Sequence, residues 1–394
     1  MRINTFRSYY IFSALVANIL FFSDATSQSD LSQISEDRKT KTVQIINDIL
    51  PSVAAIQTFK ESGTDGIYNL QVGSASVIHE DGYLLTNEHV VSGMVQGNAI
   101  LYNSQPKHFK VIASMASEDL AIIKINSDEK LKPVPIGRSN DLLLGEPVIT
   151  IGNPGGLNHS ISTGIISGLN RSTSTGSTFL PWMIQTSAAV SGGNSGGPLI
   201  NALGQQIGTI TSKQLGSENI NFAISIDRIR EVLPNLLSPE LRYGFWLGIE
   251  IQMLSDQVVV KSIKDNSPAS DSKFIAGDII KSVNGTQISH PFDFYFSLIG
   301  LKQNQKINMT ILRENSTIDL EVTLGELKLI DPIETIEVTQ GISYKLYEGQ
   351  WDKLPDFNKL KSFTKSLSFS ELLDTYPKLL EGKFFGRAIV NPNK

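Results

Sequence analysis

The chain of 394 residues contains no cysteine, and this absence excludes disulfide bonds, a thiolate nucleophile and metal sites built on cysteine. Histidine is also scarce: the 5 histidines lie far apart in the sequence, and no acidic loop has the spacing of a calcium site. A phosphate-binding Gly-Lys-Ser/Thr loop is missing as well. We therefore expect no metal, no cofactor and no use of ATP.

Neither sign of charge dominates, because the formal net charge is only -5. Proteins that bind nucleic acid normally carry a basic stripe, so nucleic acid is not an expected partner. Beyond the N-terminal region, no apolar run is long enough to cross a membrane. With 40% hydrophobic residues, a chain of this length can form two or three separate cores.

The N-terminus has the composition of an export signal. Two arginines precede a nearly uncharged apolar run from Tyr9 to Phe22, and small residues follow up to Ser27. This order is typical of a secretory signal peptide, and the run is shorter than the roughly 20 residues that a membrane span needs. We predict that residues 1–27 are cleaved and that the protein is periplasmic or secreted. The alternative is an uncleaved anchor helix.

The rest of the chain divides into blocks of different pattern. Residues 28–51 form a polar leader followed by a helix that ends at Pro51. Residues 52–236 alternate short β-rich runs with Gly, Asn and Ser turns, which indicates an all-β barrel or sandwich closed by a helix over residues 227–237. Residues 241–328 form a second, compact domain of strands and one helix. Residues 329–394 are a shorter C-terminal segment.

The stretch "SAAVSGGNSGGPLI" sets Ser195 among glycines that are costly to hold in a fixed loop. A serine nucleophile needs a histidine to take its proton, and the carbonyl oxygen that becomes anionic needs backbone N–H groups aimed at it. Gly192 and Gly193 would let the loop curl, so that the amides of Gly193 and Ser195 form an oxyanion hole. The alternative is a plain glycine turn between two strands.

Candidate partners for the serine lie earlier in the chain. His89 ends the β-rich run "GYLLTNEHVV", and Asp119 stands directly before the apolar run "LAIIKI". We predict that His89 is the general base and that Asp119 orients it. Glu118 is the competing acid, and either partner could instead be an ordinary structural residue. We expect the other four histidines to lie on the surface: His79, His108, His159 and His290.

In these motifs the sequence resembles the HtrA/DegP family of chymotrypsin-fold serine proteases with PDZ domains. The matching stretches are "GYLLTNEHVV", "EDLAIIKI", "VITIGNPGGL", "ISTGIISGLNR", "IQTSAAVSGGNSGGPLIN" and "INFAISID", in family order across residues 43–234. The resemblance implies a mainly β fold, with a chymotrypsin-like double β-barrel over residues 52–236. His89 would come from the first barrel, Asp119 from the connection between the barrels and Ser195 from the second barrel.

The sequence departs from the family pattern near the serine. Ser187 stands where the family usually has an acid, and Ser191-Gly192 stands where it usually has Asn-Pro. In this family the oxyanion loop switches between inactive and active conformations. We therefore expect the triad to be present, but we do not expect the enzyme to be active at all times. Asn194 cannot form the internal ion pair that matures digestive proteases, so zymogen cleavage of that type is not expected.

The substrate pocket lacks a charge at the position where trypsin-like enzymes place an acid, because Ala189 stands there. A basic substrate side chain would be buried without a partner at a cost of several kcal/mol. We therefore predict cleavage after small or medium aliphatic residues. Val190, Ile220 and Phe222 are the candidate pocket walls, and their alternative role is barrel core.

The second domain also matches the family. "GFWLGIEI" resembles a PDZ carboxylate-binding loop followed by its strand, and "NSPASDSKFIAGDIIKSVNG" resembles the PDZ segment that comes next. We therefore predict an α+β PDZ domain over residues 241–328 that binds a peptide as an added strand. The alternative is an ordinary hairpin. The predicted peptide-binding residues are Trp246, Leu247, Gly248, Ile249 and Ile251.

The C-terminal segment carries the aromatic motif "YKLYEGQWDKLPDF". It resembles the opening of carbohydrate-associated β-sandwich modules, but too few residues follow to complete one. Tyr347, Trp351 and Phe357 could stack on a sugar or pack onto the rest of the protein, and we assign no function to residues 329–394.

The sequence thus predicts an exported, ATP-independent serine endopeptidase of protein quality control that degrades unfolded or misfolded proteins. Its PDZ domain would bind exposed chain ends, and the resemblance implies a homotrimer. One alternative function is a chaperone or scaffold that binds unfolded chains with little proteolysis. A second, which depends on the tail alone, is a polysaccharide-binding surface protein.

Overall fold

The computed structural model describes residues 38–62, 67–153, 159–175, 178–213, 219–327, 342–346 and 363–367. Residues up to Leu327 form one compact unit, and residues from Lys328 onward form a second. In the second unit, β21 (Ile342–Leu346) pairs antiparallel with β22 (Phe363–Leu367). The predicted signal peptide and the tail aromatics Tyr347, Trp351 and Phe357 lie outside the described residues.

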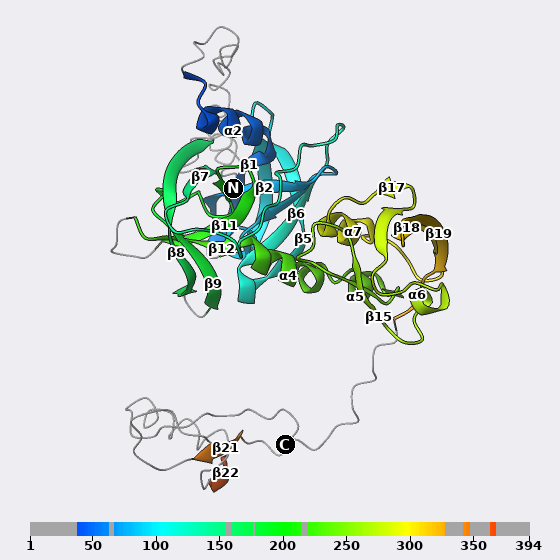
Figure 1. Ribbon diagram of the computed structural model, residues 1–394. Coiled ribbons are helices and arrows are strands. Elements are labelled where there is room, and N and C mark those ends of the chain that lie inside the picture. Colours follow the sequence, from blue (N-terminus) through cyan, green and yellow to red (C-terminus); the bar gives the residue numbers. More distant parts are fainter. Residues whose placement is uncertain are drawn as a thin grey trace, which may run out of the picture. The chain divides into compact units, whose positions relative to one another are not determined.

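The first barrel is closed by six described strands in the order β1-β2-β3-β6-β5-β4 (Figure 1). Its interior is filled by aliphatic side chains such as Ile56, Val77, Leu84 and Ile123, all without exposed surface. The strands are β1 (Val53–Ser62), β2 (Ile67–His79), β3 (Tyr83–Thr86), β4 (Met94–Leu101), β5 (Lys107–Met115) and β6 (Leu120–Ile125). A single helical turn, α3 (Glu88–Val91), follows β3, and the 3₁₀ turn η4 (Ala116–Glu118) precedes β6.

The second barrel repeats this architecture in the order β10-β11-β12-β9-β8-β7. Leu199, Ile207, Ile210 and Ala223 lie in its core. The strands are β7 (Pro147–Gly152), β8 (Ser160–Thr175), β9 (Thr178–Thr186), β10 (Pro198–Asn201), β11 (Gln206–Lys213) and β12 (Asn221–Ser225). The loop from β9 to β10 carries Ser195. The predicted double β-barrel is confirmed.

Two helices flank the barrels. The helix α2 (Lys41–Ile49) begins at Thr40, whose hydroxyl accepts a hydrogen bond from the Val43 amide at 3.3 Å, and the 3₁₀ turn η3 (Leu50–Ser52) follows it. The helix α4 (Ile226–Leu237) buries its apolar positions and ends at Ser238, followed by Pro239. It therefore forms where the sequence predicts it. Within the described residues, no helix combines the length and the apolar character needed to cross a membrane.

The second domain begins with the short helix α5 (Pro239–Tyr243) and mixes short strands with helices. Phe245, Phe292 and Phe294 are buried in its core. Its other elements are β13 (Phe245–Trp246), β14 (Ile249–Ile251), β15 (Val260–Ile263), α6 (Pro268–Asp271), β16 (Ile279–Val283), β17 (Thr286–Gln287), α7 (Pro291–Ser297), β18 (Lys306–Arg313), β19 (Ser316–Thr323) and β20 (Gly325–Glu326).

The expected surface position of the histidines holds for His108 and is wrong for His79, which is 9% exposed. The His79 ring lies 5.1 Å from the ring of Phe296 on α7, because the β2–β3 hairpin packs against the second domain. His159 and His290 are partly buried, and burial lowers the pKa of all three buried or partly buried rings. The burial of His79 depends on a residue of another domain, so the residues next to it in the sequence do not indicate it.

Arg230 on α4 joins the second domain to the protease barrels. Its side chain is 2% exposed and donates hydrogen bonds to the main-chain carbonyls of Met253 and Ser255, both at 2.7 Å. Burial lowers the pKa of this guanidinium, while Asp227, 3.9 Å away, raises it. The contacts fix the loop after β14 against α4.

Candidate active site

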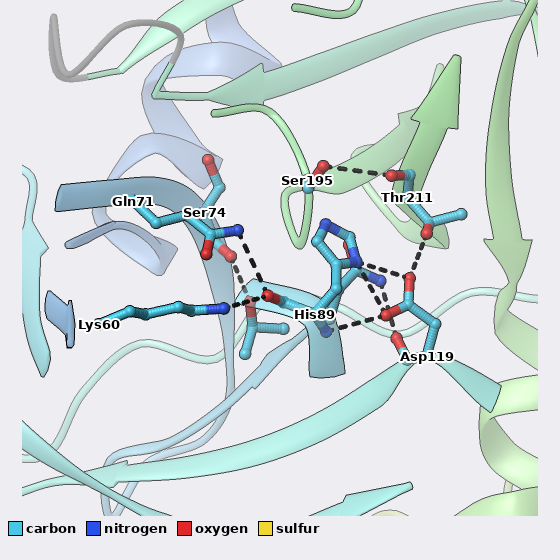
Figure 2. A network of polar contacts seen from close by, with 9 residues as sticks. Lys60, Gln71, Ser74, His89, Asp119, Ser195 and Thr211 are labelled. Atoms are coloured by element: carbon cyan, nitrogen blue, oxygen red, sulfur yellow. Dashed lines mark hydrogen bonds and ion pairs between the residues drawn. The ribbon is translucent and has the colours of Figure 1, made fainter. Parts of the chain in front are cut away.

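His89 and Asp119 are brought together by two loops of the first barrel. The His89 Nδ1 atom lies 2.8 Å from Asp119 Oδ1 and 3.0 Å from Oδ2, and the His89 main-chain amide donates to Oδ1 at 3.1 Å (Figure 2). His89 lies in α3 directly after β3, and Asp119 lies between η4 and β6. The expectation that Asp119 comes from the connection between the barrels is therefore wrong, because the strand after it, β6, lies between β3 and β5 in the first barrel.

The Asp119 carboxylate is buried, with its side chain 8% exposed against 42% for His89. Besides His89, the Thr211 hydroxyl of β11 donates to its Oδ2 atom, so a residue of the second barrel also holds it. Asp119 has φ 51, in the left-handed region that aspartate enters at lower cost than most residues. The competing acid Glu118 instead forms an ion pair with Arg228 on α4.

Ser195 lies beside this pair, on the loop from β9 to β10. In the part of the chain that the structure describes, its hydroxyl donates to the main-chain carbonyl of Thr211, 3.2 Å away, and forms no hydrogen bond with the His89 ring. Figure 2 shows the hydroxyl directed toward Thr211. The structure thus places the three predicted residues at one site, with two of them joined by hydrogen bonds and the serine turned aside.

The loop that carries Ser195 has two main-chain amides without a main-chain acceptor among the described residues. The Asn194 amide donates to the Ser191 carbonyl at 3.0 Å, and Gly193 has φ 106, a combination typical of a type II turn. Asn194, Gly196 and Gly197 all donate to main-chain carbonyls. Among the described residues, the amides of Gly193 and Ser195 donate to none. These two donors are therefore available to a ligand.

Gly192 does not have the role that the sequence suggests. Its φ lies outside the left-handed region, and a Cβ atom added there would meet no described atom within 4 Å. The backbone therefore does not require glycine at this position, whereas the turn does require it at Gly193.

Ser74 of β2 anchors this loop from the first barrel. Its side chain is completely buried; its hydroxyl donates to the Gly193 carbonyl at 2.7 Å and accepts from the Asn153 amide at 2.9 Å. Its own amide donates to the Ser195 carbonyl at 2.8 Å. Sequence reasoning missed Ser74 and Thr211, since a serine or threonine inside a β-rich run carries no local signal of such contacts.

A second pair of side chains holds the main chain of the histidine. Lys60 Nζ and Gln71 Nε2 both donate to the His89 carbonyl oxygen, at 3.1 and 3.3 Å. Burial lowers the pKa of Lys60, while nearby Glu88 raises it. These contacts from β1 and β2 fix α3 against the barrel wall.

The candidate pocket residues lie in different surroundings. Phe222 is 7% exposed and belongs to the hydrophobic core, which is the alternative placement that the sequence left open. Val190 and Ile220 are partly buried and pack against core clusters, and Ala189 is exposed. Their assignment as pocket walls stays a prediction.

Three of the predicted peptide-binding residues, Gly248, Ile249 and Ile251, line a groove of about 1010 Å³ between the second domain and α4. Leu247 and Ile251 are buried, Ile249 begins β14, and Trp246 pairs with Gly325 in β20. The amides of Leu247 and Gly248 both donate to the Glu240 carboxylate. Nothing in the sequence pattern points to Glu240.

The described residues contain no group of three His, Asp or Glu side chains placed to hold a metal ion. The arrangement that they do contain is a histidine held by a buried carboxylate, a nearby serine and two free amides. Together with two β-barrels, this defines the class of trypsin-like serine peptidases.

Family models agree with this class. A trypsin-like peptidase domain matches residues 73–208, and a PDZ domain matches residues 246–324. Protease Do-like 1, chloroplastic, of Arabidopsis thaliana is 31% identical over 345 residues, which are 79% of this chain and 79% of the relative. The probable periplasmic serine endoprotease DegP-like of Brucella suis biovar 1 is 32% identical over 273 residues, 65% of this chain and 52% of the relative.

Among solved structures, the HtrA-type protease AlgW with tripeptide is 29% identical, with a TM-score of 0.46, and covers 73% of this chain and 98% of that chain. The serine endoprotease from Yersinia pestis is 27% identical, with a TM-score of 0.43 and the same coverage. This chain spans about half the length of the bacterial relatives named DegP-like. It belongs to the HtrA/DegP family of serine endoproteases, which combine a trypsin-like peptidase domain with a PDZ domain.

Proposed function

We propose that this protein is an exported, ATP-independent serine endopeptidase of protein quality control, which degrades unfolded or misfolded proteins. The observation that carries the proposal is the His89–Asp119 pair, joined at 2.8 Å beside a serine loop with two free amides. The relatives named as periplasmic endoproteases support export and peptide-bond hydrolysis. The cleavage of residues 1–27 remains part of the proposal.

The reaction would follow from these contacts. His89 takes the Ser195 proton while Ser195 Oγ attacks the scissile carbonyl, and Asp119 stabilises the imidazolium that forms. The amides of Gly193 and Ser195 hold the oxyanion, where one such donor contributes about 3–4 kcal/mol to lowering the barrier. His89 then returns the proton to the leaving amine, and water hydrolyses the acyl-enzyme by the same steps in reverse.

One rearrangement must precede the attack. The Ser195 hydroxyl donates to Thr211 and has to turn toward His89, a change of side-chain rotamer that substrate binding can favour. The Ser191-Gly192 departure lies in the turn beside it. We therefore infer that the protein rests in a low-activity state and that substrate shifts it to the active one.

Substrates would be unfolded chains that can lie extended across the active site and that have an accessible C-terminus. We propose that cleavage follows small or medium aliphatic residues, since Ala189 provides no charge for a basic side chain.

The PDZ groove would bind exposed C-terminal ends, and three copies would assemble as a homotrimer. Light scattering of the purified chain measures that assembly, and a monomer at micromolar concentration would contradict it.

Casein digestion tests the central proposal. We expect the wild-type chain to digest casein and to be labelled by a fluorophosphonate, and the Ser195→Ala variant to do neither. Ser191→Ala, in the same loop, is the matched control and should keep both activities. Digestion that persists in Ser195→Ala would contradict the assigned nucleophile, and cleavage mainly after Lys or Arg would contradict the pocket.

One observation favours the chaperone alternative, namely the Ser195 hydroxyl turned away from His89. A chaperone would suppress aggregation of a denatured protein equally well with or without the Ser195 hydroxyl. If the wild-type chain suppresses aggregation but takes no fluorophosphonate label, the alternative function replaces the peptidase.

A further inference from the structure

The PDZ carboxylate-binding loop is already occupied by a carboxylate of this chain. The Leu247 amide lies 2.8 Å from Glu240 Oε1, and the Gly248 amide lies 2.9 Å from the same oxygen. Two successive amides converging on one oxygen form the kind of main-chain nest that binds anions and captures C-terminal carboxylates. The loop is thus shaped for a carboxylate, and Glu240 supplies one.

Gly248 shows that the loop conformation depends on its sequence. Its φ is 82, and an added Cβ atom would lie 2.3 Å from Ser267 Cβ, so only glycine fits. The Lys264 amide donates to the Gly248 carbonyl at 2.9 Å, which holds the next peptide unit of the loop. The two amides that face Glu240 are therefore preorganised.

Glu240 reaches the loop from the junction of the two domains. It lies in α5, directly after α4, and Pro239 beside it is buried. Glu240, Gly248, Ile249, Ile251, Tyr295 and Leu298 line the groove at this loop, and α4 and the loop after β14 form the rest of its wall. The carboxylate of Glu240 therefore occupies the end of the groove where the terminal carboxylate of an added peptide strand would bind.

We propose that Glu240 is an internal ligand of the PDZ loop, and that the C-terminal carboxylate of a substrate must displace it. The inference rests on the proposed role of this groove as the site for chain ends. Because two carboxylates cannot share the same two amides, the apparent dissociation constant is the intrinsic one divided by the uncapped fraction. If the cap is closed about 90–99% of the time, it weakens peptide binding about 10- to 100-fold.

The affinity for a free chain end tests the proposal. The full chain carrying Ser195→Ala, which prevents cleavage of the probe, is titrated with a fluorescent decapeptide that ends in valine with a free carboxylate. The same peptide with an amidated end is titrated in parallel. We expect Glu240→Ala to bind the free acid about 10- to 100-fold more tightly, and Glu240→Gln to gain less because its amide oxygen still accepts hydrogen bonds.

Two controls separate this effect from charge and folding. Glu326→Gln removes one negative charge from an exposed site of the same domain outside the groove and should leave the affinity within about twofold of the parent chain. Hydrogen exchange should be faster at the Leu247 and Gly248 amides in Glu240→Ala, and added free-acid peptide should slow it again.

The proposal is overturned if Glu240→Ala leaves the free-acid affinity unchanged or weaker. It is also overturned if Glu240→Ala raises the affinity for the amidated peptide by as much as for the free acid, or if neither the parent chain nor Glu240→Ala binds the free acid. Casein digestion by the chain with Ser195 intact is measured separately. Loss of that activity would count against the proposed endopeptidase and not against the cap.

Discussion

Ser74 connects the two barrels at the site. Its hydroxyl and its amide bond to Gly193 and Ser195, which are separated from it by more than a hundred residues in the chain. These bonds hold the carbonyl of Gly193, while the Asn194 amide is held by Ser191. With the 193–194 peptide fixed at both ends, the Gly193 amide has little freedom to turn away from a substrate oxygen. Ser74 is a positioning residue in this account.

Replacing Ser74 with alanine should therefore slow the reaction more than it weakens substrate binding. We expect kcat to fall about 10- to 100-fold, less than the loss of an oxyanion donor itself, with KM within about twofold. Steady-state kinetics with a fluorogenic peptide measure both constants. Ser76→Ala is the matched control, since Ser76 lies on the same strand, is equally buried, and its hydroxyl has no hydrogen-bond partner among the described residues. Equal kcat values for the two variants would remove the positioning role.

The helix α7 depends on a histidine for its N-terminus. His290 Nδ1 accepts from the Phe292 amide at 3.2 Å, and Asp293 Oδ2 accepts from the His290 amide at 2.9 Å, which together form a capping box. Burial, together with the charge of Arg230, lowers the pKa of His290 to about 4, although nearby Asp256 raises it. The folded state therefore holds a neutral ring, and the cap requires that neutral ring as an acceptor.

The sign of the pH effect follows from that direction. In the unfolded chain His290 becomes protonated below about pH 6.5, whereas in the folded chain it stays neutral down to about pH 4. The unfolded state therefore binds more protons in this range, and the free energy of unfolding falls as the pH falls from about 6.5 to about 4. Between about pH 7 and pH 5 we expect His290 to account for a loss of about 2 kcal/mol. His290→Asn keeps a side-chain acceptor at the cap but has no group that titrates in this range. Its free energy of unfolding should therefore fall by about 2 kcal/mol less than that of the parent chain.

Urea denaturation at the two pH values measures this difference. His108→Asn is the control, because His108 is exposed and should behave like the parent chain. The lowered pKa of His79 acts in the same direction in all three proteins. If the parent chain and His290→Asn lose equal stability, the neutral cap is not the cause of acid sensitivity.

At the scale of the whole molecule, α4 couples the peptidase to the PDZ domain. Arg228 on this helix bonds to Glu118, next to Asp119, whereas Arg230 bonds to the PDZ loop after β14. The same helix leads into α5 and Glu240. A change at the PDZ groove and a change near Asp119 therefore meet on one helix.

Arg230→Met should loosen the PDZ domain, because the buried carbonyl of Met253 and the partly buried carbonyl of Ser255 would lose their charged donor. Hydrogen bonds to charged groups contribute about 1.5–3 kcal/mol, so local opening should rise at least about tenfold. Thermolysin cleavage of the segment 238–244, in a Ser195→Ala background, measures that opening. Arg228→Met serves as the comparison, since its partners lie outside the PDZ domain. Equal cleavage rates would show that Arg230 does not hold the domains together.

Local patterns indicated an all-β barrel or sandwich and made His89, Asp119 and Ser195 candidates, and the resemblance to the HtrA/DegP family decided for the double barrel and the triad. Alternation of apolar residues, turn residues and the glycine-flanked serine are all features of short segments. Asp119 could be preferred over Glu118 because it abuts the buried run of β6, and the ion pair of Glu118 with Arg228 agrees with that choice. The burial of His79 could not be predicted in the same way, because its neighbour Phe296 belongs to another domain.

The amino-acid sequence by itself determined which chemical groups this protein can use and roughly where its barrels and its PDZ domain lie, because secondary structure and motifs depend on neighbours in the chain. The tertiary structure alone decided the direction of the Ser195 hydroxyl, the bond from Ser74 to Gly193 and the capping of the PDZ loop by Glu240. Each of these is a hydrogen bond whose partner is selected by distance and orientation in the folded chain, which no short segment of sequence encodes.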